Sequence, residues 1–385
     1  MKFTRSAIAS VAALGLLGLG AIPANADDHV LVADVFSPLA FSIGEDGTVY
    51  VSESFIGQLV AVDPGTDERT TLAAVEGGFM GGVDAAPGQL IHYTVSAPPE
   101  FADGPPTDTS LNMIKKNGKP KKLRSMLRYE QRFNPDASNL YGVLDPGVDC
   151  AEATGMLTDF IGPISNNGGI DSNPYSVAVA SDGTRFVGDA AGNSIIRVSA
   201  NGKQMSTVAV LPPVEQTLTA EALAAIIEEV NAVLAGMGVP EEELLPEDAL
   251  AACAGEPFQS EPVPTDIEIG PDGDYYVSSL PGFPESPLAG SVFRIDHVSG
   301  AVEQIATGFT GATDLAVAAD GTIYVAELFG FQVARIDPGD NSTSDAAFVE
   351  CPSAVEIGPD GYVYVAEAGI CADEPAPGRI VRLDL

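Results

Sequence analysis

Acidic residues recur at two places in a phrase that this chain repeats, and they are the side chains with the clearest potential for chemistry. One set ends a strand-like run and comprises Glu53, Asp189, Glu327 and Glu367. A second set lies just before a run or near its start and comprises Asp171, Asp266 and Asp314. Carboxylates are good ligands for Ca²⁺, which takes about 6–8 oxygen atoms. If the fold brings the two sets together at one end of a central channel, they form a calcium site. The alternative is that each acid pairs, as a structural contact, with nearby backbone or with the recurrent arginines Arg197, Arg294, Arg335 and Arg382.

The chain offers little other catalytic chemistry. Its three histidines, His29, His92 and His297, fall in an N-terminal segment, a strand-like run and an expected outer turn, so a converging set of general bases is not expected. The G-x-S-x-G, H-E-x-x-H and P-loop patterns are absent from the sequence. We assign no catalytic residue, and calcium is the single cofactor that the residues suggest.

The repeated phrase must position these acids, and it predicts the fold. Copies begin at Ser37 (SPLAFSIGEDGTVYVSES), Asn173 (NPYSVAVASDGTRFVGDA), Val263 (VPTDIEIGPDGDYYVSSL), Gly311 (GATDLAVAADGTIYVAEL) and Cys351 (CPSAVEIGPDGYVYVAEA). Each copy has an alternating strand, a tight Asp-Gly turn and a second strand. With a degenerate unit at Gly88, the turn glycines are Gly47, Gly88, Gly183, Gly273, Gly321 and Gly361. The shorter spacings match a four-stranded blade of about 40–50 residues. The sequence therefore predicts an all-β, six-bladed β-propeller.

The two ends of the chain predict how the ring closes. The last repeat stops at Leu385 after three strands, so its blade lacks a fourth. The segment HVLVADVF from His29 is a spare strand near the N-terminus. Pairing the two would hide two sheet edges that otherwise invite association. We therefore predict a propeller closed by the N-terminal strand of the mature chain.

The long insertions all fall on one face of the predicted propeller. We label the strands of a blade A to D from the axis outwards, so that the Asp-Gly turns join A to B. The B–C loops and the D–A links then share the opposite face, which we call the insertion face. It carries insertions 134–172 and 212–262, both D–A links, and the B–C loops 97–109, 281–289 and 369–378. Since loops on a rigid scaffold usually carry binding function, we expect the partner to bind there.

The insertion between blades 3 and 4 contains a predicted helix. Apolar residues recur at helical spacing at Leu223, Ile226, Ile227, Val230, Val233 and Leu234. Thr219 suits an N-cap, and Gly236 or Gly238 suits the end of the helix. We expect this amphipathic helix to lie on the propeller. The 134–172 insertion, rich in Gly, Asn and Pro, is expected to be irregular.

Residues 1–26 form an expected signal peptide, followed by the propeller over 27–385. Lys2 and Arg5 precede an apolar run from Ala7 to Ile22 and the small-residue site Ala24-Asn25-Ala26. The protein is therefore expected to be secreted or periplasmic, and no later apolar run is long enough to span a membrane. A formal charge of −36 opposes binding to nucleic acid. We expect a monomer, with an unknown small molecule or a protein as its partner.

Four cysteines in an exported chain indicate disulfides, for which three pairings exist. Cys351 begins strand A of the last blade, and Cys371 lies in the B–C loop of that blade. Cys150 and Cys253 lie in the insertions on either side of the third blade. All four are expected on the insertion face. We predict the pairs Cys150–Cys253 and Cys351–Cys371.

Basic residues are concentrated in one hairpin. Eight of the chain's 18 Lys and Arg lie between Lys115 and Arg132, and the expected basic patch comprises Lys115, Lys116, Lys119, Lys121, Lys122, Arg124 and Arg128. Such a patch can grip an anionic polymer. The alternative is a solvated sheet edge, where charges deter pairing between molecules.

The repeats also carry a family resemblance. The segments MLRYEQRFNPD (126–136), DSNPYSVAVASDG (171–183), DAAGNSIIRVSANGKQMSTVAVLPP (189–213) and VPTDIEIGPDGDYYVSSLPGFP (263–284) resemble the ScyD/ScyE family of exported bacterial propellers. More generally, the repeat resembles NHL and SMP-30-like six-bladed propellers. The resemblance covers nearly all of the chain after the signal peptide, although the helical insertion exceeds the family pattern. It implies a propeller fold and export, with no established reaction.

Three functions follow from these expectations. The first is a non-catalytic binding or scaffold protein that uses the insertion face. The second is a calcium-dependent hydrolase or lyase of the SMP-30-like type with an axial metal. Enzymes of that type place Asn or Asp where this chain has Thr265 and Thr313, and its acids are shifted by one residue, which turns them to the other sheet face. The third is a surface module that binds an anionic polymer through the 115–132 hairpin.

Overall fold

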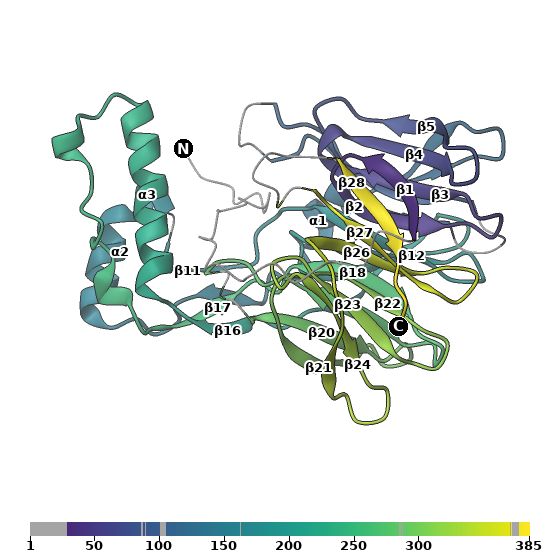
Figure 1. Ribbon diagram of the computed structural model, residues 1–385. Coiled ribbons are helices and arrows are strands. Elements are labelled where there is room, and N and C mark those ends of the chain that lie inside the picture. The colour runs from purple at the N-terminus through teal and green to yellow at the C-terminus, as the bar shows by residue number, and fades with distance from the viewer. Residues whose placement is uncertain are drawn as a thin grey trace.

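The chain folds into six antiparallel four-stranded sheets that form a closed ring (Figure 1). The computed structural model describes residues 29–85, 88, 90–100, 105–161, 163–284, 286, 288–369, 371 and 377–385, so the expected signal peptide lies outside the described residues. Neighbouring innermost strands contact one another all the way around the ring. In ring order they are β2 (Pro38–Ile43), β6 (Phe79–Asp84), β12 (Pro174–Val179), β18 (Pro264–Ile269), β22 (Ala312–Val317) and β26 (Pro352–Ile357). The predicted six-bladed propeller is confirmed.

The other strands follow outwards in chain order within each blade. In blades 1 to 3 they are β3 (Val49–Glu53), β4 (Gln58–Asp63) and β5 (Glu68–Ala74), then β7 (His92–Ser96), β8 (Thr109–Ile114) and β9 (Pro120–Ser125), then β13 (Arg185–Asp189), β14 (Ser194–Val198) and β15 (Met205–Val210). In blades 4 to 6 they are β19 (Tyr275–Ser279), β20 (Gly290–Ile295) and β21 (Val302–Phe309), then β23 (Ile323–Glu327), β24 (Gln332–Ile336) and β25 (Thr343–Phe348), then β27 (Val363–Glu367) and β28 (Gly378–Arg382).

The N-terminal strand closes the ring, as the sequence predicts. Strand β1 (Val30–Val35) pairs antiparallel with β28 and supplies the fourth strand of blade 6. Val32 and Val35 join Val51 of blade 1 and Ile380 of blade 6 in one buried core. The closing strand therefore contributes apolar packing between the first and last blades as well as backbone pairing.

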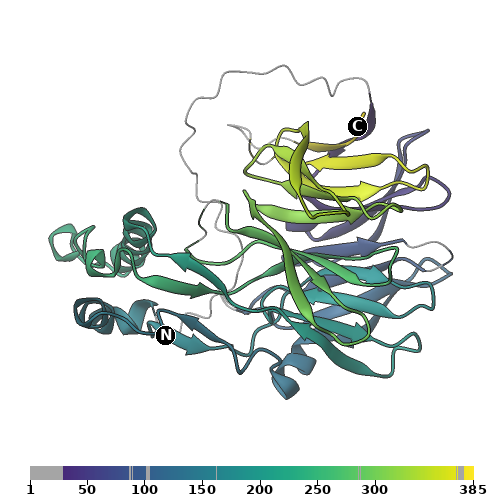
Figure 2. The ribbon, with the colours of Figure 1, turned by 90° about the horizontal axis from the view of Figure 1, so that it is seen from below.

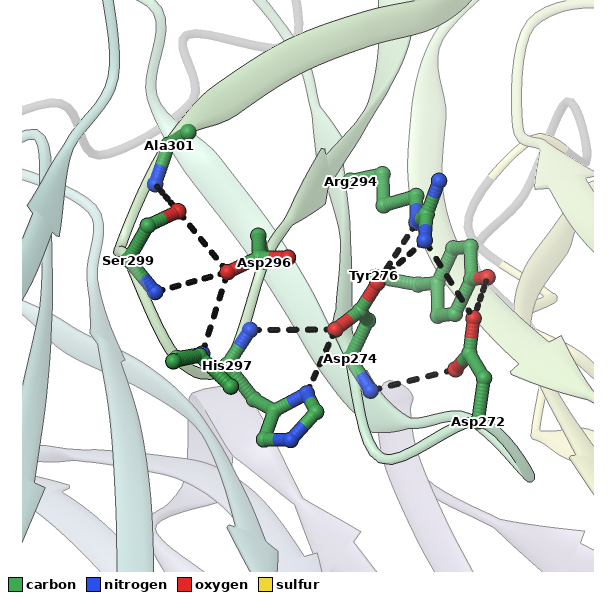
Figure 3. A network of polar contacts seen from close by, with 9 residues as sticks. Asp272, Asp274, Tyr276, Arg294, Asp296, His297, Ser299 and Ala301 are labelled. Atoms are coloured by element: carbon green, nitrogen blue, oxygen red, sulfur yellow. Dashed lines mark hydrogen bonds and ion pairs between the residues drawn. The ribbon is translucent and has the colours of Figure 1, made fainter.

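Each Asp-Gly turn is held by its own aspartate. In blade 4, Asp272 accepts a hydrogen bond from the backbone N–H of Asp274 at 3.1 Å and another from the Tyr276 hydroxyl at 3.0 Å (Figure 3). The equivalent aspartate accepts the N–H of the residue two positions on at Asp46, Asp182, Asp320 and Asp360. The glycine between them, Gly273 in blade 4, has a φ of 85°, which glycine adopts without a steric penalty. The repeated Asp-Gly pair therefore specifies a local turn.

The two long insertions fold together into one unit, the insertion subdomain. Its sheet has the order β11-β10-β17-β16. The first insertion supplies β10 (Leu140–Gly142), α2 (Val148–Ile161) and β11 (Ser165–Asn167), and the second supplies β16 (Val214–Thr217), α3 (Ala220–Gly236), η2 (Glu241–Glu243), η3 (Ala251–Cys253) and β17 (Pro257–Ser260). Figures 1 and 2 both show α2 and α3 beyond the strands of the propeller, and the two helices contact each other.

The predicted helix forms, but it does not lie on the propeller. Helix α3 begins after Thr219, whose hydroxyl oxygen accepts the N–H of Ala222 at 3.1 Å, and it ends at Gly236. Its buried residues Leu223 and Ile227 pack with Leu157 of α2 in the core of the subdomain. The first insertion, expected to be irregular, supplies that second helix. The apolar spacing specified a helix with one buried face, but it did not specify which element would cover that face.

Both predicted disulfides are present. Cys150 of α2 is bonded to Cys253 of η3, with a separation of 103 residues, and Cys351 is bonded to Cys371 within blade 6. The first bond joins the two insertions within the subdomain core.

Among the described residues, no helix has the length and apolar character that a membrane crossing requires.

Candidate functional site

A cavity of about 260 Å³ lies on the propeller axis. Residues from the innermost strands of all six blades line it, and the carboxylates on these strands are Asp84, Asp266, Glu268, Asp314 and Glu356. We call these five residues the axial cluster. Glu45 and Pro359 also line the cavity and belong to A–B turns, so it lies toward the turn end of the axis. The described residues around it include no Lys, Arg or His.

Four acids of the axial cluster, Asp266, Glu268, Asp314 and Glu356, have a raised pKa. Burial raises the pKa of Asp266 to about 7, and the nearby Asp84 adds to this shift. Burial also raises the pKa of Glu268, Asp314 and Glu356 well above the usual range, and neighbouring carboxylates raise it further. Since no described cation lines the cavity, a bound cation or polar ligand would stabilise the ionised carboxylates.

Several axial acids also bridge neighbouring blades. Asp84 accepts the N–H of Val179 in the next blade at 2.6 Å. The backbone N–H of Leu315 lowers the pKa of Asp266, and that of Val355 lowers the pKa of Asp314, each from the following blade. These contacts oppose the effect of burial in part, and they tie the innermost strands together around the axis.

The structure distributes the seven acids predicted as ligands over several places. Asp266 and Asp314 line the axial cavity, as described above. Glu53, Glu327 and Glu367 do not line it and each makes a local contact. Glu53 accepts the N–H of Phe36 at 3.0 Å, Glu327 accepts that of Thr310 at 2.6 Å, and Glu367 pairs with Arg379. These three acids hold the chain at the point where strand B meets the D–A link or the next strand.

The remaining two predicted acids, Asp171 and Asp189, lie in a second group that also contains Glu130 and Asp136. We call these four residues the lateral cluster. Glu130 belongs to α1 (Met126–Phe133), which leads from β9 into the first insertion, and it is only 1% exposed. Burial raises the pKa of Glu130 to about 9, and Asp189, Asp136 and Asp171 add to the shift. Burial also raises the pKa of Asp189, to about 6.

Three of the four recurrent arginines, Arg294, Arg335 and Arg382, pair with acids near the turns instead of the strand-end acids. Asp274 accepts a hydrogen bond from Nε of Arg294 at 2.7 Å, and its carboxylate lies 2.7 Å from Nδ1 of His297 (Figure 3). Arg335 and Arg382 lie 3.5 Å from Asp337 and Asp384. The Arg335 and Arg382 pairs lie toward solvent and stabilise the turn end of the blades weakly, whereas Asp274 is buried beneath its two partners.

The basic hairpin is an outer edge of blade 2. Lys115 and Lys119 form the turn between β8 and β9, and β9 is the outermost strand. Lys116, Lys119 and Lys121 are exposed, whereas Lys122 pairs with Asp108. The patch therefore lies at a sheet edge, as the alternative interpretation expected, and its exposed lysines are free to meet an anionic partner as well.

The sequence interpretation missed five acids that the structure brings into these clusters. Glu268 and Glu356 occupy the same repeat position. Glu268 is two residues after Asp266, so strand periodicity places the side chains of Glu268 and Asp266 on the same face of the sheet. That signal was available. Asp84 lies in the degenerate second repeat, and Glu130 and Asp136 lie outside the repeats, so these three acids carried no such signal. In the described part of the chain, no three Asp, Glu, His or Cys side chains are already arranged to hold one metal ion.

Comparison with known proteins identifies the fold. No protein-family model matches the chain, and no curated protein matches it. Among solved structures, it is similar to the major allergen Mala s 1 of Malassezia sympodialis, with a TM-score of 0.55, 13% identity, and 94% of this chain and 97% of that one covered. It is also similar to a putative oxidoreductase (glucose dehydrogenase) from Thermus thermophilus, with a TM-score of 0.52, 13% identity, and 92% and 98% covered. A third similar structure is a gluconolactonase from Xanthomonas campestris, with a TM-score of 0.51, 12% identity, and 92% of this chain and 89% of that one covered. Identities this low support the propeller fold and no specific function.

Proposed function

We propose that this protein is an exported binding protein that holds a positively charged protein partner on its insertion face. One observation carries the proposal. Two insertions on either side of blade 3 fold into a single subdomain with its own sheet, core and disulfide. The six blades close the ring without it. A folded and cross-linked unit that ring closure does not need is best explained by a role in binding.

The charge of the subdomain indicates the chemistry of the partner. Segment 137–172 contains five Asp and Glu residues and segment 212–262 contains eleven, and neither contains Lys, Arg or His. Three consecutive acids, Glu241, Glu242 and Glu243, form the exposed η2. A concentrated negative surface attracts a cationic partner over distances of about a Debye length, roughly 8 Å at physiological salt.

The subdomain also exposes apolar side chains beside these charges. Val148 is 74% exposed and Met156 is 78% exposed, and both lie on α2 at a spacing of eight residues, with Glu152 between them. Residues four apart share one side of a helix, so the three form a mixed apolar and acidic stripe. Such a stripe suits a partner that offers both apolar contact and positive charge.

The test compares two charge-matched variants. In the first, Glu241, Glu242 and Glu243 are replaced by Gln. In the control, Glu68→Gln, Glu303→Gln and Asp345→Asn remove three exposed charges from outer strands of the propeller. Fluorescence anisotropy measures the Kd of a lysine-rich peptide of about 20 residues at physiological salt. We expect roughly tenfold weaker binding for the first variant and less than about twofold for the control. Equal weakening in both variants, or none, would contradict the proposal.

Export rests on the two disulfides and on the N-terminal sequence. Both disulfides suit an oxidising compartment. Expression of the full chain in a bacterial host should release a protein that begins at Asp27, which N-terminal sequencing detects. Retention of residues 1–26 on cytoplasmic protein would count against export.

A second candidate function is favoured by the axial cavity. Five carboxylates around one space suit a calcium-dependent hydrolase or lyase that binds a polar ligand at the axis. In that case Asp266→Asn should abolish calcium-dependent lactone hydrolysis, whereas the triple Gln variant of η2 should leave it unchanged. Absence of any calcium-dependent hydrolysis in the native protein would remove this candidate.

A further inference from the structure

We propose that Glu130, Asp171 and Asp189 bind a Ca²⁺ ion beside Gly192, at the base of the insertion subdomain. These residues lie outside the described lining of the axial cavity. The proposal does not depend on the partner proposed for the insertion face.

The oxygen atoms come from three segments and converge on space that a glycine leaves open. A methyl group placed on Gly192 would lie 3.2 Å from Oε2 of Glu130 and 3.3 Å from the carboxyl carbon of Asp189. It would also lie 3.6 Å from the backbone carbonyl oxygen of Asp171. Gly192 belongs to the B–C loop of blade 3, Glu130 to α1, and Asp171 to the end of the first insertion. A carboxylate oxygen of Glu130, the carboxyl group of Asp189 and the backbone carbonyl of Asp171 therefore lie around one point.

Buried oxygen atoms without partners supply the second observation. Glu130 is 1% exposed, and its Oε1 has no hydrogen-bond partner. Asp136 is also 1% exposed, and its Oδ1 has none, although its Oδ2 accepts from Tyr141 and Asn193. An unpaired buried carboxylate is costly, and folded proteins rarely retain one without a proton, an ion or a water molecule. A cation at this point would remove the cost.

Two of the proposed ligands are already fixed in place. Asp189 accepts hydrogen bonds from the Ser172 hydroxyl at 2.7 Å and from the N–H groups of Asn173 and Gly192 at 2.6 Å and 3.2 Å. Asp171 accepts the N–H of Ser172 at 2.8 Å. The Glu130 carboxylate has no such anchor. Binding therefore requires a shift of the Glu130 side chain toward Asp189, because the acids are not yet close enough to hold one ion.

The ligand set fits calcium better than other divalent ions. All of its members are carboxylate or carbonyl oxygens, which are hard ligands, and neither thiolate nor imidazole takes part. The mixture of side chains and backbone from three segments is irregular, which Ca²⁺ tolerates and the octahedral Mg²⁺ does not. The ion would join α1, the end of the first insertion and the loop of blade 3, and would therefore fix the base of the subdomain to the propeller.

The test titrates Ca²⁺ into the chelator-treated mature protein by calorimetry and repeats the titration with two isosteric variants. Glu130→Gln removes a proposed ligand, and Glu268→Gln removes an acid of the axial cluster as the matched control. We expect one Ca²⁺ per chain, Kd at least about tenfold higher in Glu130→Gln, and no change in Glu268→Gln. A second readout is the luminescence of Tb³⁺ excited through the nearby Tyr141, which should be lost in Glu130→Gln only.

Three results would overturn the proposal. The first is absence of binding up to about 10 mM Ca²⁺, roughly tenfold above the Kd of about 1 mM at the weak end for extracellular sites. The second is unchanged binding in Glu130→Gln, provided that thermal unfolding shows the variant to be folded. The third is loss of binding in Glu268→Gln alone, which would place the ion at the axis and support the second candidate function instead.

Discussion

The axial and lateral clusters are both groups of buried acids, yet they are built differently. The axial cluster takes its acids from the innermost strands of several blades, where the repeat sets the backbone position. The lateral cluster takes Glu130 and Asp136 from the link between blades 2 and 3, outside the repeat. At the axis, carboxylates raise the pKa of one another, and hydrogen bonds from neighbouring strands offset this in part. In the lateral cluster, Asp189 has three donors while Glu130 has an oxygen with no partner.

This difference separates acids that already support the fold through hydrogen bonds from an acid that has an oxygen left for a ligand. An acid that is saturated with donors from nearby backbone, as Asp189 is, holds two segments together whether or not a ligand is present. An acid with a buried oxygen that has no partner, as Glu130 has, carries an unfavourable free energy of desolvation that a bound ion can offset. Within the proposed site, Asp189 thus supports the fold and is also a preformed ligand, whereas the Glu130 side chain must shift to bind the ion.

The largest expected effect is on folding stability. Asp189→Ala leaves the Ser172 hydroxyl and two N–H groups without their acceptor, so it should lower the free energy of unfolding by about 3 kcal/mol. Glu268→Gln replaces an acid whose ionised form is disfavoured by burial and by neighbouring carboxylates, so it should raise that free energy by about 1 kcal/mol at pH 8 without calcium. Urea unfolding measures both. If the two variants change stability in the same direction, the distinction between the clusters fails.

The pH dependence of stability is the next largest effect. Between pH 6.5 and 9, acids in the unfolded chain are ionised, while the folded chain retains protons on Asp266, with a pKa of about 7, and on Glu130, with a pKa of about 9. The folded state binds more protons, so stability is present at the lower pH and is lost as pH rises through these pKa values. His92, whose pKa burial lowers to about 4, is neutral throughout this range.

The urea midpoint of the native protein should therefore fall from pH 6.5 to 9. Asp266→Asn should reduce only the early part of this fall, whereas Glu130→Gln should reduce the fall across the whole range. A midpoint that stays constant or rises over the same range would show that the buried acids do not retain their protons.

A smaller effect is expected from filling the space beside Gly192. Gly192→Ala brings a methyl group within 3.2 Å of Oε2 of Glu130, so it should cost about 1 kcal/mol and weaken Ca²⁺ binding. Gly236→Ala, at the end of α3 with no atom near the added methyl, is the matched control and should be neutral or slightly stabilising. Calorimetry and thermal unfolding measure both, and equal Ca²⁺ affinity in both variants would argue against the lateral site.

The smallest effect is expected at an acid outside both clusters. Glu327→Gln keeps an oxygen that can accept the N–H of Thr310, so stability should change by less than about 1 kcal/mol and calcium affinity should not change. A large loss of calcium affinity in this variant would restore the original prediction that strand-end acids are ligands.

Repeated local patterns made most of the fold predictable. The Asp-Gly turns, the spare strand at His29 and the helix after Thr219 each depend on neighbouring residues, and the structure contains all three. The disulfide partners followed because the strand count placed each cysteine on the insertion face. The site was less predictable. Asp266 and Asp314 do line the axial cavity, but Glu53 and Glu327 bind nearby backbone, because a side chain at a strand end meets the adjacent link first.

The sequence by itself determined the number of blades, the closing strand and the turns, because each depends on periodicity or on contacts close in the chain. Tertiary structure alone decided that the two insertions share a sheet and that Glu130 lies beside Asp189. Side-chain spacing records which face of an element is buried, but it does not identify the distant element that covers that face. Both the proposed binding subdomain and the proposed calcium site depend on such distant pairs.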